Sequence, residues 1–220
     1  MEDALRSCRV VLEVGSKKTF ASALDWPGWS RSGKNERTTI ETLLAYADRY
    51  AVVTALAGLD VTLPGEPKVI DRQSGDMTTD FGAPGRIHGV EKEPVERAEL
   101  ERQLSLLRAS WALFDEVVAT VTPELRKGPR GGGRDRDGIF AHVVEADRNY
   151  ARKIGVRTPR FDAIDRVALL EHREAVFAIV PDLRGGEPVS PNGWPVRYAL
   201  RRMAWHILDH AWEMQDKTLA

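Results

Sequence analysis

Residues 203–214, MAWHILDHAWEM, place His206 and His210 four residues apart in a pattern typical of an amphipathic helix. On a helical wheel of about 100° per residue, the apolar side chains form one broad stripe. The two histidines lie together at its border. They are therefore either metal ligands at the rim of a core or polar residues on a packed helix. Ile207 follows His206, which excludes the HExxH pattern of zinc proteases.

The helical period extends through the C-terminal half of the chain, which indicates a helix bundle. A first long helix ends before Pro123, a second is predicted at 138–154, a third at 163–180, and a fourth begins near Pro195. The pattern predicts an all-α, up-down four-helix bundle over residues 91–220. The first helix carries its apolar seam at Leu100, Leu104, Leu107, Trp111, Phe114, Val118 and Val121.

The N-terminal half has the pattern of a small α+β domain over residues 1–90. Residues 8–24 contain two strand-forming runs split by Gly15–Lys18, which predicts a β-hairpin. A helix is expected at 37–59, and short strands or extended pieces at 68–75 and 78–85. Trp26 and Trp29 flank a Pro-Gly turn and are interpreted as interdomain packing residues.

A third histidine has a matching position on the second predicted helix. His142 lies at the border of an apolar stripe, as His206 and His210 do on the fourth helix. Three neutral imidazoles plus water form an accepted open ligand set for a divalent metal. Glu145 and Asp209 are candidates to orient an imidazole or to act as a base toward bound water.

The glycine-rich loop at 126–138 leads directly into the helix that carries His142. Its Arg130, Arg134 and Arg136 are candidates for binding an anionic cofactor or substrate. A solvated loop between helices is an equally good interpretation. No P-loop or dinucleotide-binding motif is present in the sequence.

With these histidines in register, residues 93–216 resemble the DinB/YfiT-like superfamily of metal-binding four-helix bundles. The resemblance depends on AHVVEADRNYARKIG around His142 and on LRRMAWHILDHAWEM around His206 and His210. It implies that the three histidines hold a divalent metal, with zinc, nickel and iron not distinguished. It also implies a metal-dependent thiol S-transferase or isomerase that uses a low-molecular-weight thiol such as mycothiol. The alternative is a non-catalytic binding or regulatory protein with a structural metal and a partner-binding N-terminal domain.

Residues 8–58 show a weaker resemblance to the HicB-type antitoxin fold. It depends on the strand, turn and helix of FASALDWPGWSRSGKNERTTIETLLAYADRY, with Asp25, Pro27, Gly28 and Gly33 at the turn positions. No catalytic residue carries over from this resemblance. The antitoxin function does not carry over either, because the C-terminal half lacks a DNA-binding pattern.

Composition limits the classes of partner. The 220 residues carry a formal net charge of −1, so nucleic-acid binding is not expected and a small-molecule substrate is favoured. No signal peptide or membrane span is predicted, which favours the cytoplasm. Trp194, Trp205 and Trp212 are expected at helix-packing or dimer contacts, leaving a homodimer open. Cys8, the only cysteine, is expected to be buried, and His88 and His172 to be exposed.

Overall fold

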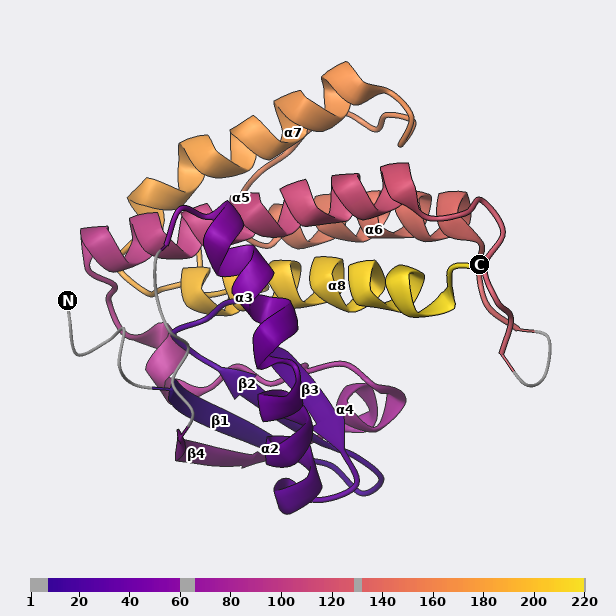
Figure 1. The fold of residues 1–220 in the computed structure, drawn as a ribbon. Coiled ribbons are helices and arrows are strands. Elements are labelled where there is room, and N and C mark those ends of the chain that lie inside the picture. Colours follow the sequence, from indigo (N-terminus) through magenta and orange to yellow (C-terminus); the bar gives the residue numbers. More distant parts are fainter. Residues whose placement is uncertain (1–7, 60–65, 129–131, 220) are drawn as a thin grey trace.

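The computed structural model describes residues 8–59, 66–128 and 132–219 (Figure 1). The N-terminal half forms a four-stranded mixed sheet of order β3-β2-β1-β4. The predicted hairpin is confirmed as β1 (Cys8–Val14) and β2 (Thr19–Ala23), which pair antiparallel. β3 (Ser30–Gly33) extends the sheet beside β2, and β4 (Pro67–Ser74) pairs parallel with β1 at the opposite edge.

The helix predicted at 37–59 is in fact two helices. α2 (Glu36–Ala45) begins at Asn35, whose side chain accepts a hydrogen bond from the backbone of Thr38. The chain bends at Tyr46 and continues as α3 (Ala47–Leu56). The bend lets α2 follow the sheet while α3 packs against the first long helix of the C-terminal half.

The prediction of extended structure at 78–85 is wrong. Met77–Phe81 forms the short helix α4, because the Asp76 side chain accepts hydrogen bonds from the backbone N–H groups of Thr78 and Thr79. This N-cap stabilises the first helical turn despite strand-forming threonines. A 3₁₀ helix, η1 (Gly89–Lys92), follows before the long helices.

The predicted fold class, an α+β domain followed by an up-down four-helix bundle, is also wrong. The described residues form a four-stranded mixed sheet and seven α-helices. The four that follow residue 91 are α5 (Arg97–Thr120), α6 (Arg136–Arg152), α7 (Arg166–Ile179) and α8 (Val196–Lys217), with the 3₁₀ helix η2 (Val180–Leu183) after α7. α5, α6 and α8 lie side by side, whereas α7 is tilted away from them (Figure 1). α3 from the N-terminal half packs on α5 instead.

The physical reason for this correction is that α8 is buried on all sides. Every residue from Tyr198 to Leu208 is buried, so the helix has no solvent-facing stripe over this length. A helix in a simple bundle buries one face, while a helix covered all round needs partners on several sides. α5 and α6 cover part of α8, and the N-terminal half covers the rest.

The Pro-Gly turn after β2 packs directly on α8. Gly28 has a φ of 96°, and a Cβ at this position would lie 2.6 Å from Leu208 and 3.1 Å from Ala204. Glycine is therefore required for both backbone conformation and space. Trp26 and Trp29 are fully buried, as their packing role predicts.

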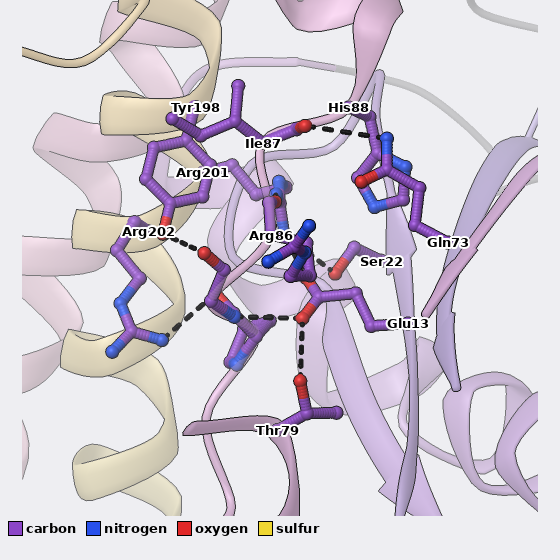
Figure 2. A network of polar contacts seen from close by, with 12 residues as sticks. Glu13, Ser22, Gln73, Thr79, Arg86, Ile87, His88, Tyr198, Arg201 and Arg202 are labelled. Carbon is purple, nitrogen blue, oxygen red and sulfur yellow. Dashed lines mark hydrogen bonds and ion pairs between the residues drawn. The ribbon is translucent and has the colours of Figure 1, made fainter. Parts of the chain in front are cut away.

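A buried ionic network joins α8 to the sheet (Figure 2). The Arg201 guanidinium donates to both carboxylate oxygens of Glu91, at 2.7 and 3.0 Å, and to the Ser22 hydroxyl at 3.1 Å. Glu13 lies 3.6 Å from the same guanidinium and accepts a hydrogen bond from the backbone of Gly85. Burial raises the pKa of Glu13. One arginine therefore compensates two buried carboxyl groups.

Two histidines expected at the surface are buried. His88 is fully buried and contacts Asp71 through Nδ1 at 2.7 Å. His172 is 1% exposed on α7, where its Nδ1 contacts the Thr158 hydroxyl at 2.9 Å. Its Nε2 lies 3.9 Å from the carboxylate of Asp147 on α6, which is also buried. The sequence around His172 did not indicate this burial, because its contacts come from Asp147 on α6 and from Thr158 and Phe161 in the segment before α7.

None of the helices within the described ranges combines the length and apolar composition that crossing a membrane requires.

Replacing Arg201 with glutamine should lower the free energy of unfolding by about 3–5 kcal/mol, because it leaves buried carboxylates without a counter-charge. Urea denaturation at pH 7 measures the change. The control is Arg97→Gln, which removes an ion pair with Glu101 whose arginine side chain is 80% exposed. That change should cost less than about 1 kcal/mol. Equal losses in the two variants would contradict the role of burial.

Asp147 and His172 should make opposite contributions to the pH dependence of stability. Burial lowers the pKa of His172 from 6.5 to about 4 and raises that of Asp147 from 3.8 to about 7. The neutral His172 therefore stabilises the fold above pH 6.5, and this contribution is lost as the pH falls toward 4. The protonated Asp147 stabilises the fold below pH 3.8, and this contribution is lost as the pH rises toward 7.

When the pH falls from 7 to 4, the free energy of unfolding of Asp147→Asn should decrease by about 3 kcal/mol more than that of the double variant Asp147→Asn/His172→Gln. In His172→Gln it should increase over the same interval. Urea denaturation at a series of pH values measures both slopes, and the double variant corrects for all other groups. Slopes of the same sign in the two single variants would rule out this assignment.

Candidate metal centre

The three histidines predicted as a metal site converge between α6 and α8. One ring nitrogen from each of His142, His206 and His210 lies within 4.8 Å of the others. The ring centroids of His142 are 5.1 Å from those of both His206 and His210, which are themselves 4.7 Å apart. The structure therefore brings the three histidines close enough to hold one metal ion.

Local sequence explains this arrangement. The spacing of four residues places His206 and His210 on the same side of α8. His142 is on α6, whose buried Ile139 and Val143 pack this helix into the core. His206 is 8% exposed, while His142 and His210 are partly exposed. The site is therefore buried at His206 and reaches the surface at His142 and His210.

The electrostatics favour neutral imidazoles, the form that binds metals. Burial, together with the neighbouring His210 and Arg134, lowers the pKa of His142. Burial and the other two histidines lower the pKa of His206 well below its ordinary value. Both rings are therefore neutral at pH 7.

The third histidine is oriented by a carboxylate. His210 Nδ1 lies 2.7 Å from Glu213 Oε2, and Glu213 also accepts a hydrogen bond from Lys217 at 2.5 Å. The hydrogen bond with His210 lowers the pKa of Glu213 to about 2, so this carboxylate is ionised and must accept the proton of Nδ1–H. The Nε2 lone pair of His210 is then free to bind a metal.

The separation of the ring nitrogens can be compared with that of a zinc site. Bonds of about 2.1 Å from zinc to imidazole separate the ligand nitrogens of a tetrahedral site by about 3.4 Å. The three nitrogens lie within 4.8 Å of one another, so a bound ion would draw them closer together. The rings of His142 and His206 make no hydrogen bond to any residue in the described part of the chain, so their nitrogens are available as ligands.

The two carboxylates predicted near the histidines are engaged elsewhere. Asp209 forms an ion pair with Arg31 at 2.5 Å, and Glu145 pairs with Arg148 at 2.6 Å. Glu145 lines an open groove of about 530 Å³ together with residues 160–163. Glu213 has the orienting role instead, and the spacing of three residues from His210 was the available signal.

The loop arginines divide in a similar way. Arg136 pairs with Asp137 at 2.8 Å, while Arg130 lies outside the described residues. Arg134 is exposed, and its positive charge contributes to the low pKa values of His142 and His206. Among the loop arginines that the structure describes, Arg134 is the one whose charge lowers the pKa values of these histidines.

Two further residues beside the histidines were not singled out from the sequence. The Tyr150 ring lies edge-on to His206, with centroids 5.6 Å apart. Arg202, one helical turn before His206, is 9% exposed and stacks over Trp205, with its guanidinium carbon 4.8 Å from the ring centroid. Tyr150 comes from α6 and Arg202 from α8, and no metal-ligand pattern in the sequence marked these two residues as neighbours.

No protein-family model, curated protein or solved structure matches this chain. Its chemistry therefore has to be inferred from the residues of the site.

Proposed function

We propose that the protein binds a divalent metal ion through His142, His206 and His210 and uses it in a thiol-dependent transfer or isomerisation. The observation that carries this proposal is the convergence of three histidine nitrogens within 4.8 Å. Zinc, nickel and iron(II) all accept imidazole and water ligands, so the donor set is compatible with each of them.

The residues around the histidines support an open rather than a closed site. The nearby carboxylates Asp209, Glu145 and Glu213 are all engaged in other hydrogen bonds. Three protein ligands therefore leave coordination positions for water or a substrate, as in catalytic rather than structural sites.

The proposed reaction class follows from the resemblance of the segments around the histidines to thiol-dependent enzymes. When bound, the ion would supply a Lewis acid that lowers the pKa of a small-molecule thiol. The thiol must come from outside the chain. Cys8 is 1% exposed and hence inaccessible, and burial raises its pKa to about 12.

Purified protein should bind about one equivalent of zinc, and His206→Ala and His210→Ala should each abolish tight binding because two imidazoles remain. Elemental analysis after dialysis and competition with a chromogenic chelator measure the stoichiometry and affinity. Zinc bound equally well by both variants would eliminate this site.

Glu213→Gln should keep the metal but bind it about 10–100-fold more weakly, because the carboxylate orients His210 without being a ligand. Glu145→Gln is the matched control on the other helix, and its affinity should equal that of the unmodified protein. Identical affinities in the two glutamine variants would refute the orienting role of Glu213.

The metal-loaded protein should catalyse addition of a low-molecular-weight thiol to an electrophilic acceptor. Loss of thiol and acceptor can be followed for mycothiol, bacillithiol and glutathione in parallel. Turnover should fall at least 100-fold in His142→Ala, from the loss of a metal ligand. If no thiol gives turnover that depends on His142 while zinc is bound, the protein holds a metal without this activity.

A further inference from the structure

We propose that Arg202 and Tyr150 form a carboxylate-binding subsite beside the three histidines. The inference rests on the proposed function for one point, namely that the bound carboxylate lies next to a metal ion. The anion site itself is argued from the surroundings of Arg202.

Arg202 is a buried cation without a carboxylate partner. Its side chain belongs to a residue only 9% exposed, and no Asp or Glu in the described residues forms an ion pair with it. Burying a charge is costly unless an opposite charge compensates it. Arg201, the adjacent arginine, shows the usual solution, since it is paired with Glu91.

The free edge of the guanidinium is the part suited to a ligand. Nη1 donates to the backbone carbonyl of Pro84 at 3.0 Å, which holds the side chain in place (Figure 2). Nη2 makes a single long contact, 3.5 Å to the Tyr150 hydroxyl, and Nε donates to no described residue. Nε and Nη2 together form the fork that binds two carboxylate oxygens.

The aromatic residues keep this fork in a fixed orientation. The guanidinium carbon lies 4.8 Å from the Trp205 ring centroid and 5.5 Å from that of Tyr150. The Tyr150 hydroxyl lies beside the fork and can donate a further hydrogen bond to the same anion. One guanidinium and one hydroxyl match the single charge of a carboxylate better than a phosphate dianion.

The position of the subsite indicates how a ligand would lie. Arg202 precedes His206 by one turn, a rise of about 6 Å along α8. A ligand held by its carboxylate therefore has its other end at the histidines if it is only a few bonds long. The carboxylate can belong to the thiol or to the acceptor, and two probes distinguish these sources.

The subsite can be tested in metal-free protein by titrating acetate and succinate and following the tryptophan fluorescence, to which Trp205 beside Arg202 contributes. Both probes should bind, and Arg202→Gln should weaken binding at least tenfold. Tyr150→Phe should weaken it less. Arg148→Gln, which removes a similarly buried arginine that already pairs with Glu145, should leave it unchanged.

Arg202→Lys keeps the positive charge and a donor for the Pro84 carbonyl but loses the fork of Nε and Nη2. It replaces the glutamine variant in the titration if that variant does not fold. It should also bind acetate several-fold more weakly than the unmodified protein. Unchanged affinity in a folded Arg202 variant, no binding of either carboxylate, or tighter Arg202-dependent binding of inorganic phosphate would each overturn the proposal.

The same titration with zinc-loaded protein tests the placement beside the histidines. Mercaptoacetate, which carries thiol and carboxylate, should bind more tightly than both acetate and 2-mercaptoethanol if the thiol carries the carboxylate, and Arg202→Gln should remove this advantage. An advantage of succinate over mercaptoacetate assigns the carboxylate to the acceptor. Failure to load zinc would refute the proposed function, while the metal-free titration would still decide the role of Arg202.

Discussion

The burial of the Arg201 guanidinium between Glu91 and Glu13 sets the orientation of α8, and most other features follow from it. A charge this deep is stable only while its carboxylate partners surround it, so the helix cannot rotate about its axis without separating them. At about 100° per residue, His206 lies about 140° and His210 about 180° around the helix from Arg201. When Arg201 points into the sheet region, the histidines must point away from it, toward α6 and His142. The ionic network that fixes the orientation of α8 therefore also fixes the direction in which the histidines point.

The periodic part of this arrangement could be predicted from the sequence. Spacing on two helices, together with the resemblance to metal-binding bundles, indicated that His142, His206 and His210 meet. Two strand-forming runs split by a turn indicated the β1–β2 hairpin. The burial of Cys8 was expected because a free cysteine usually behaves as a small buried apolar residue. For the histidines and the hairpin, a local pattern determined which side of an element faces the core.

The features that were missed depend on contacts between distant residues. Nothing near Asp209 in the sequence indicates Arg31 as its partner, and the burial of His172 depends on contacts with α6 and with the segment before α7. The four-helix bundle was wrong because a wheel records one apolar stripe, while α8 is covered from several sides. Glu213 is different. Its position three residues after His210 can be read from the sequence. Choosing Glu213 rather than Asp209 as the orienting carboxylate required knowing that Asp209 forms an ion pair with Arg31.

The Arg201 network also has a consequence for dissecting the molecule. A fragment that begins at residue 91 would keep all three histidines and Glu91, yet it would lose Glu13, Ser22 and the Gly28 turn that covers Ala204 and Leu208. Such a fragment would expose an apolar side of α8 and a half-compensated arginine to water. The shortest unit that holds the three histidines together is therefore longer than the segment that contains them. The sheet supports the histidine cluster without contributing a residue to it.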